Sequence, residues 1–504
     1  MADKSVIIIG AGLSGLSAGC YCRMNGYATR IFEHHTGPGG VASTWRRGEY
    51  LIDGGVHFLM GHRPGTATYE RYRELGATAG QAFLDMKEYA AYTSEADGRE
   101  VRVTSDLDAT FAALKALSPA DAGVLDDLHK HALHMTTVDL DAYDMARPPE
   151  LGGGSADNLH QLWHLRHQLK HFSGHNARPV AQVAKGIHDP FLRWILENLF
   201  LPEVPVWFVS MLLGLLSGNQ IGLLSEGSLS FARSIERRYL DLGGEVTYRS
   251  TVAEVLVEND RAIGVRLLDG TEHRADIVVS AADGYTTIFG MLGGRYLSDK
   301  VRNRYRRWPL FRPVVSVSFG LDRTFPDEAV LTMVALDRPL AVGGHTAPGC
   351  SIRIFNYGDS FAPAGKTVVQ VQVETDWDTW HDLRRSDRPA YEAKKAETAS
   401  QILSHLDRRW PGFSSRVDMT DVATPYTIWR YTGNHRGSYE GWLPTSENIT
   451  TVMERTLPGL SNFYMAGQWV VPGGGVPPSL YSGRHVAQII CKRDGREFVA
   501  TTVG

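Results

Sequence analysis

Residues 5–15 have the sequence Ser5-Val6-Ile7-Ile8-Ile9-Gly10-Ala11-Gly12-Leu13-Ser14-Gly15, near the start of a chain of 504 residues. The β-branched run is typical of a buried parallel strand, and the glycines after it have the spacing G-x-G-x-x-G. The first glycine of such a motif makes a tight turn, the second lets the backbone approach a pyrophosphate, and the third lets helix and sheet pack closely. A helix is expected over residues 13–25, with Gly26 ending it.

A second strand is expected over residues 28–33, and Glu33 stands at its end. An acid about 20 residues after the glycine motif accepts hydrogen bonds from a ribose diol. Strand, turn, helix and acid together predict a dinucleotide-binding βαβ unit.

Two further glycine sites favour a flavin over a nicotinamide. Gly39-Gly40 and Gly54-Gly55 flank a short expected strand, and glycine permits the close backbone approach that a flat ring needs. No second strand-linked G-x-G-x-x-G follows, so a dedicated NAD(P)H domain is not expected. The sequence therefore predicts bound FAD.

The α/β pattern returns in two later segments. Residues 228–242 predict a helix, and residues 245–248, 251–258, 262–268 and 277–281 predict strands. Near the end, residues 463–468 predict a strand and turn, and Gly473-Gly474-Gly475 leads into a helix expected from about Ser479. The N-terminus of that helix, aimed at the flavin pyrimidine, would stabilise negative charge on the reduced cofactor.

The fold class predicted is α/β: a discontinuous Rossmann-type FAD-binding domain with a second, α+β substrate domain. The first takes residues 1–85, 226–300 and 455–504, and the second takes residues 86–225 and 301–454, including a helical cap. The second domain is expected because strands alternate with turns over residues 314–373 and a helix follows over residues 389–406.

With these motifs and with residues 278–283, 361–367 and 430–434, nearly the whole chain resembles the phytoene desaturases, carotenoid isomerases and retinol saturases within the amine-oxidase-like flavoproteins. The resemblance implies an FAD enzyme that acts on carbon–carbon double bonds of a lipophilic polyene. It also implies that the backbone of Val252 holds the adenine, and Ala281 stands where carotenoid desaturases usually carry Asn. Relatives that tether the flavin use a cysteine before the C-terminal turn, whereas Cys491 lies beyond it, so the FAD is expected to be non-covalent.

The residues predicted to contact FAD come from all of these segments. They are Gly10, Gly12, Leu13, Ser14, Gly15, Glu33, Gly39, Gly40, Ser43, Gly55, Val56, His57, Val252, Ala281, Asp283, Gly467, Gln468, Gly475, Val476 and Pro477.

Four residues are candidates for proton transfer: His57, Tyr431, His435 and Tyr439. His57 follows the second glycine site, and the other three lie in a segment, residues 429–442, where aromatic and titratable side chains alternate. Such a segment suits the wall of a lipophilic pocket that also moves a proton. The alternatives are a packed loop for the segment and a core histidine for His57.

The resemblance implies a lipophilic small molecule as partner, and composition excludes another class of partner. A formal net charge of −4 with mixed signs argues against nucleic acid. The four cysteines form no C-x-x-C pair and are expected as buried thiols in a reducing compartment. His160, His164, His167 and His171 share one helical face, with His175 beyond, but no acid or cysteine completes a ligand set, so no metal is expected.

The expected location is the cytoplasm, because the N-terminal apolar run is too short for a signal peptide. Residues 204–216 are also too short to span a bilayer and include Pro205 and Gly214. Residues 207–213 are expected as core or a tunnel wall, with peripheral membrane contact as the alternative. For the basic run 300–307, the expectation is a solvated helix face, and the alternative is contact with anionic headgroups. The sequence leaves the oligomeric state open.

Four functions remain after this reasoning. The leading one is desaturation or saturation of a polyene, and the second is a redox-neutral isomerase or cyclase reaction. A flavin amine oxidase is a third, disfavoured because no aromatic cage for an amine can be assigned. A non-catalytic FAD-binding protein is the last.

Overall fold

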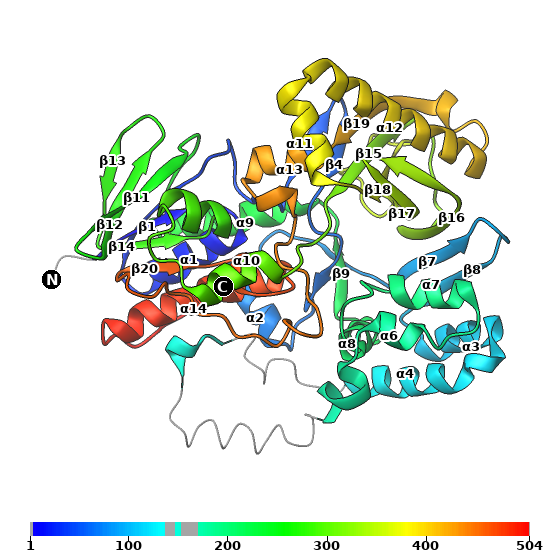
Figure 1. Cartoon of the computed structure of the whole chain (residues 1–504), viewed down its shortest axis with the longest axis horizontal. Coiled ribbons are helices and arrows are strands. Elements are labelled where there is room, and N and C mark those ends of the chain that lie inside the picture. The colour runs from blue at the N-terminus through cyan, green and yellow to red at the C-terminus, as the bar shows by residue number, and fades with distance from the viewer. Residues whose placement is uncertain (1–3, 137–146, 153–169, 503–504) are drawn as a thin grey trace.

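A five-stranded parallel sheet forms the core of one side of the molecule, on the left in Figure 1. The computed structural model describes residues 4–136, 147–152 and 170–502. The order across this sheet is β10 (Glu245–Thr247), β2 (Ala28–Phe32), β1 (Ser5–Ile9), β14 (Ile277–Ser280) and β20 (Phe463–Met465). Its strands come from three distant segments of the chain, and every pairing is parallel. The α/β fold with a Rossmann-like region is thus confirmed.

Three helices cover this sheet: α1 (Leu13–Met24), α9 (Ser228–Asp241) and α14 (Val476–Arg493). α1 packs against both of the others, and small residues let it approach closely. A Cβ on Gly483 of α14 would lie 2.5 Å from the backbone oxygen of Ser14. α14 begins three residues before the predicted start at Ser479, because prolines in the first turn need no N–H donor and favour a helix start.

Three small sheets accompany the two large ones. One is antiparallel and contains β11 (Val252–Glu258), β12 (Arg261–Leu267) and β13 (Glu272–Arg274). A hairpin joins β3 (Thr44–Arg47) to β4 (Tyr50–Asp53), and β9 (Ile221–Leu224) lies between β5 (Leu59–Met60) and β6 (Phe83–Asp85).

A seven-stranded sheet lies on the other side of the molecule, on the right in Figure 1. Its order is β19 (Val417–Ala423), β15 (Val314–Leu321), β18 (Thr367–Glu374), β17 (His345–Ile354), β16 (Leu331–Val342), β7 (Glu88–Ser94) and β8 (Glu100–Thr104). All neighbours are antiparallel except β16 and β7. Helices α11 (Trp377–Ser386), α12 (Arg388–Arg409) and α13 (Pro425–Thr432) lie beside it (Figure 1), and Trp380 of α11 is fully buried among its strands' side chains.

A helical lobe lies below β7 and β8 in Figure 1. Its members are α3 (Leu107–Leu117), α4 (Ala122–Met135), α6 (Val180–Ala184), α7 (Pro190–Asn198) and α8 (Val206–Ser217). The helix expected around residues 155–172 falls almost wholly outside the described residues, as do His160, His164 and His167; residues 170–172 form a short 3-10 turn. In the described ranges, no group of histidine, cysteine and acidic side chains could hold a metal.

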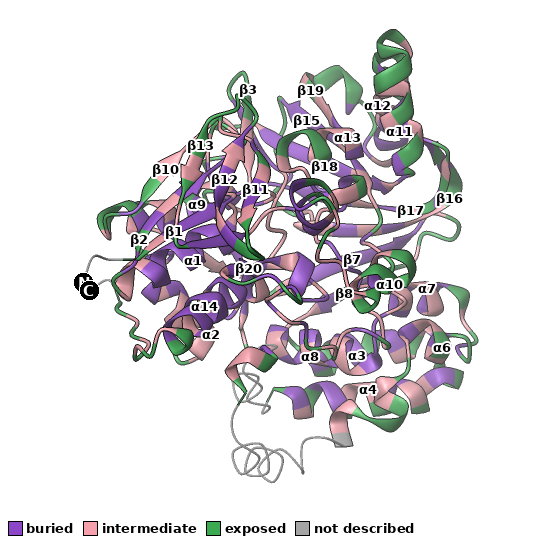
Figure 2. Cartoon of the chain, turned by 60° about the vertical axis from the view of Figure 1, so that its left-hand side comes forward, coloured by how far each residue is buried: buried purple, intermediate pink, exposed green. Residues whose placement is uncertain are grey.

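Two further helices are α2 (Ala67–Glu74), whose Tyr72 is buried in the core beside the parallel sheet, and α10 (Asp299–Arg307), whose Val301 and Tyr305 pack on a neighbouring core cluster. α10 carries the basic run, and two of its cations pair with one acid: Glu454 accepts from Lys300 and lies 3.7 Å from Arg304. Figure 2 shows strands of both sheets largely buried and the outer faces of α11 and α12 exposed. Within the described residues, no helix combines the length and apolar character that crossing a membrane requires.

Candidate active site

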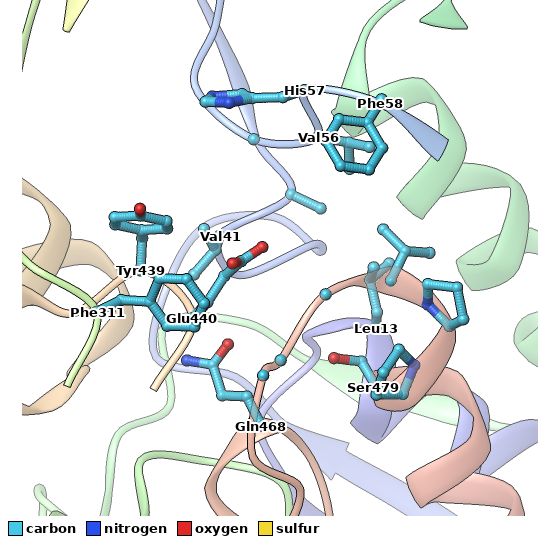
Figure 3. A pocket seen from close by; sticks show the side chains of 18 of the residues that line it. Leu13, Val41, Val56, His57, Phe58, Phe311, Tyr439, Glu440, Gln468 and Ser479 are labelled. Carbon is cyan, nitrogen blue, oxygen red and sulfur yellow. The ribbon is translucent and has the colours of Figure 1, made fainter. Parts of the chain in front are cut away.

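A cavity of about 1690 Å³ lies between the two large sheets and the helical lobe. It extends from the end of β1 at Ile9 to α8 at Leu215. Ordinary ligand pockets have volumes of roughly 300–1,000 Å³, so this one has room for a dinucleotide and a second molecule. Figure 3 shows its central part, where His57 and Glu440 approach the same open space from different segments.

The glycine motif forms one end of the cavity in the predicted way. Gly10 has φ +96°, and a Cβ on Gly12 would meet no protein atom within 4 Å, so that face is open to a ligand. A bridge pairs Gly12 with Gly39, and the Gly39 N–H donates to the carbonyl of Ala11 at 2.9 Å. α1 begins here without a side-chain cap, so its first N–H groups face the cavity end as anion donors.

Gly15 does not line the cavity but sits behind the turn. A Cβ at this position would lie 1.9 Å from the carbonyl oxygen of Gly10. It therefore acts as the close-packing glycine of the motif, which the spacing predicts.

Glu33 lines the cavity at the end of β2 and is 8% exposed. One carboxylate oxygen accepts the N–H of Ala11 at 2.6 Å and the other accepts the N–H of His35 at 2.7 Å. The carboxylate thus fixes the glycine turn, and each oxygen keeps a lone pair for a ribose hydroxyl.

Replacing Glu33 by alanine is expected to weaken FAD binding by roughly tenfold or more, because hydrogen bonds to a charged group contribute about 1.5–3 kcal/mol. Titration of apoprotein with FAD, followed by flavin fluorescence, measures this. Glu245→Ala, an exposed acid on the neighbouring strand β10, is the matched control and is expected to bind FAD normally. Equal affinity of Glu33→Ala and the wild type would contradict the assignment.

The segment before β5 forms one side of the central cavity. A Cβ on Gly55 would lie 2.7 Å from the Ser228 hydroxyl, and the Val56 N–H donates to that hydroxyl at 2.7 Å. Asp53 is buried and accepts from both Ser228 and Gly55, which fixes the turn. Gly39 and Gly40 line the cavity, whereas Ser43, predicted with them, does not and turns back to its own loop.

The C-terminal glycine block forms the opposite side. Gly467 has φ +101° and its N–H donates to Ser482 at 2.9 Å, while Gln468 lines the cavity beside it. Val476 and Pro477 begin α14 at the cavity wall. Because Pro477 and Pro478 have no N–H, Val476 is the donor of that first turn, and the positive end of the helix remains.

The predicted residues on the adenosine side also reach the cavity: Val252 and Ala281 line it. Asp283 lines it too, but its carboxylate accepts the N–H groups of Thr286 at 2.7 Å and His435 at 2.8 Å. Burial raises the pKa of Asp283 to about 6. Its evident role is to hold the His435 loop against the sheet.

The four proton-transfer candidates lie in different places. His57 and Tyr439 line the central cavity. Burial, with the nearby Arg353 cation, lowers the pKa of His57 well below its usual value, so its ring is neutral. Tyr431 is 44% exposed and packs edge-on against His35, which places it at the Glu33 end of the cavity.

His435 does not line the cavity. Its ring stacks on Tyr285 with centroids 4.1 Å apart, and burial lowers its pKa to about 4. The pattern of aromatic and titratable residues could not separate a side chain facing the cavity from one facing the other way.

Glu440 also lines the cavity, although it is not one of the four candidates for proton transfer. Burial raises the pKa of its carboxyl to about 7. Its backbone packs on the glycine block, since a Cβ on Gly474 would lie 2.6 Å from the Glu440 carbonyl oxygen. An acid next to Tyr439 within an aromatic segment was the available signal, but burial of the carboxyl is a tertiary property.

The far end of the cavity is a tunnel with apolar and aromatic walls. Its residues come mainly from α7, α8 and the loop between them: Trp194, Phe200, Leu201, Trp207, Phe208, Met211, Leu212 and Leu215. Within residues 207–213, Trp207, Phe208, Met211 and Leu212 thus line the cavity, while Val209 and Leu213 are buried in the core, so both expected roles occur. The four cysteines are buried free thiols, as predicted.

Fold and site together define a flavoprotein in which one cavity runs from the glycine turn at Gly12 to an apolar, aromatic end at Trp207. The family model of flavin containing amine oxidoreductases matches residues 13–491, and the chain belongs to this family. Its cofactor is FAD, which the uncapped start of α1, the open Gly12 and the Glu33 carboxylate fit.

Named relatives are similar over nearly the whole chain. The chloroplastic prolycopene isomerase of Arabidopsis thaliana is 23% identical over 97% of this chain and 83% of its own. The neurosporene-forming phytoene desaturase of Rhodobacter capsulatus is 25% identical over 96% of this chain and 93% of its own. The resemblance to carotenoid desaturases and isomerases is thus confirmed.

Solved structures share the fold at low identity. Cyclohexylamine oxidase from Brevibacterium oxydans superposes with a TM-score of 0.60 at 16% identity, covering 98% of this chain and 100% of that one. Putrescine oxidase bound to putrescine gives 0.62 at 14% identity, covering 97% and 99%.

Proposed function

We propose that this protein is an FAD-dependent oxidoreductase that adds or removes hydrogen across adjacent carbons of a lipophilic, isoprenoid-like polyene. The observation that carries the proposal is the continuity of one cavity from the dinucleotide turn at Gly12 to the aromatic tunnel at Trp207. Such walls suit a long apolar substrate laid against the cofactor.

The bound FAD supplies two-electron redox chemistry. The chain supplies the proton acceptor: in the desaturating direction the Glu440 carboxylate takes the proton that leaves the substrate carbon. A group with a pKa of about 7 suits this task, because near neutral pH both its forms are populated. His57 is neutral and is proposed to orient the substrate by a hydrogen bond rather than by charge.

A redox-neutral isomerisation is the second candidate, supported by the similarity to prolycopene isomerases over 97% of the chain. There Glu440 would exchange a proton with the polyene, and the product would have the same mass as the substrate.

Product mass is the test that separates these reactions. Purified FAD-loaded protein is incubated anaerobically with a series of polyenes, with and without NAD(P)H, and the products are analysed by mass spectrometry. Loss or gain of two hydrogen atoms supports the proposal, and an isomer of equal mass supports the second candidate. Peroxide released in air from simple amines, without change in any polyene, would overturn both in favour of an amine oxidase.

Met211→Trp is expected to narrow the tunnel and raise KM for long polyenes by roughly tenfold, because overfilling a packed apolar site costs about 1–3 kcal/mol. The visible spectrum of the bound flavin is expected to stay unchanged, since Met211 lies on α8 in the tunnel wall. Leu240→Trp on the outer face of α9, where Leu240 is 46% exposed, is the control. An unchanged KM for Met211→Trp would show that the substrate does not pass α8.

A further inference from the structure

The cavity wall formed by the seven-stranded sheet includes polar side chains among apolar ones, whereas the helical wall is mainly apolar and aromatic. Two rows of polar side chains cross three neighbouring strands in register: Ser316, Gln372 and Ser351 in one row, and Ser318, Gln370 and Arg353 in the next. Residues two apart on a strand share a face, so both rows point to the same side. Within the rows, Gln372 donates to the Ser316 hydroxyl and Gln370 to the Ser318 hydroxyl, each at 3.2 Å, so these uncharged members already have partners.

Arg353 is the charged member of these rows. It lines the cavity yet is only 3% exposed, and its guanidinium lies over the Phe355 ring, 4.8 Å from the centroid. Nη1 donates to the Gln370 side chain at 3.5 Å, a long contact. In the part of the chain that the structure describes, Nη2 has no hydrogen-bond partner.

The Arg353 cation also has an acid and a phenol nearby: its charge opposes the burial that raises the pKa of Asp53, and it likewise opposes the burial that raises the pKa of Tyr357. The acids nevertheless have hydrogen-bond or ion-pair partners of their own. The Asp53 carboxylate accepts from the Ser228 hydroxyl at 2.7 Å, from the Ser228 N–H at 3.2 Å and from the Gly55 N–H at 3.1 Å. Glu374, farther along β18, lies 3.4 Å from Arg312. Asp53 thus offsets part of the Arg353 charge, but Nη2 keeps a donor without a hydrogen-bond partner in the described part of the chain, at a residue that lines the cavity.

A buried donor without a partner is unfavourable, and arginine matches a carboxylate in both charge and geometry. We propose that Arg353 binds a carboxylate at one end of the substrate, so that the substrate class is an acidic polyene lipid rather than a hydrocarbon. This inference rests on the proposed function for the polyene body of the ligand, which the aromatic tunnel would hold. Ser316, Ser351 and Gln372, which also line the cavity, would hydrogen-bond to the carboxylate end of the substrate.

Binding of matched ligands tests the proposal without turnover. All-trans-retinoic acid and the hydrocarbon with a methyl group in place of its carboxyl are titrated anaerobically into FAD-loaded protein, and the shift of the flavin band gives each Kd. The wild type is expected to bind the acid at least about tenfold more tightly than the hydrocarbon, the strength of a charge-assisted hydrogen bond. Arg353→Met is expected to bind both equally, with the hydrocarbon Kd unchanged.

Arg353→Lys, which keeps the charge but not the fork, is expected to retain part of the preference. Arg416→Met, at an exposed arginine before β19, is the matched control and should keep the wild-type preference. If Arg353→Met fails to retain flavin, Arg353→Gln replaces it in the same titration. Equal affinity of the wild type for both ligands, or a preference that survives removal of the cation, would overturn the inference. A preference for the acid without any redox change in any polyene would instead overturn the proposed function and leave this inference standing.

Discussion

Replacing Glu440 by glutamine is expected to lower kcat by roughly 100- to 10,000-fold, the usual contribution of a positioned acid or base. Glutamine has nearly the same shape and hydrogen-bonds in the same place, but it cannot exchange a proton. The flavin spectrum and the substrate Kd should therefore remain close to those of the wild type. Stopped-flow kinetics of flavin reduction by the polyene measures the loss.

The pH profile gives an independent check on the same residue. Burial raises the pKa of the Glu440 carboxyl to about 7, so the ionised, proton-accepting form increases as pH rises through about 7. The rate of desaturation should rise over that range in the wild type and become flat in Glu440→Gln. For saturation the acid form is needed, and the rate should fall over the same range. Glu447→Gln, an exposed acid in the next loop, is the control; full activity in Glu440→Gln would remove the carboxyl from the mechanism.

Replacing Gly15 by alanine is expected to abolish stable FAD binding and to lower the free energy of unfolding by roughly 1–3 kcal/mol. The added Cβ would lie 1.9 Å from the Gly10 carbonyl oxygen and 3.3 Å from the Ala281 Cβ, so the turn or the helix must move. Gly10 and Ala281 are both predicted to contact FAD. Displacing either would therefore remove a contact with the cofactor. Chemical denaturation and the flavin content of the purified variant measure the two effects.

Gly123→Ala is the matched control, because a Cβ at Gly123 in the first turn of α4 would meet nothing within 4 Å. Alanine in a helix is favoured over glycine, so that variant should be as stable as the wild type or more so. A Gly15→Ala protein that purifies with a full complement of flavin would contradict the role given to the motif.

The cofactor half of the molecule could be predicted because its signals are local. A β-branched strand, a glycine turn whose spacing has a mechanical reason and an acid at the next strand end all lie within 33 residues. The expected start of α14 at Ser479 is three residues late, because Pro477 and Pro478 belong to the first turn of the helix, where proline is favoured.

The reaction half could be predicted only in outline, because its residues meet through the tertiary fold. Glu440 acquires its shifted pKa from burial against the glycine block, and His435 loses access to the cavity by stacking on Tyr285. Arg353 is an ordinary strand residue in the sequence, and its importance appears only when β15, β17 and β18 lie side by side.

The anaerobic visible spectrum of the FAD-loaded protein directly tests whether the bound flavin exchanges electrons with a polyene. One sample receives an isoprenoid polyene acid. A second sample receives NAD(P)H and then the more unsaturated form of the same polyene. We expect one of these additions to change the flavin redox state in step with conversion of the polyene, and we expect Glu440→Gln to slow this change. A flavin band that stays oxidised with every polyene, together with a reduced flavin that no unsaturated polyene reoxidises, would contradict the proposed redox function.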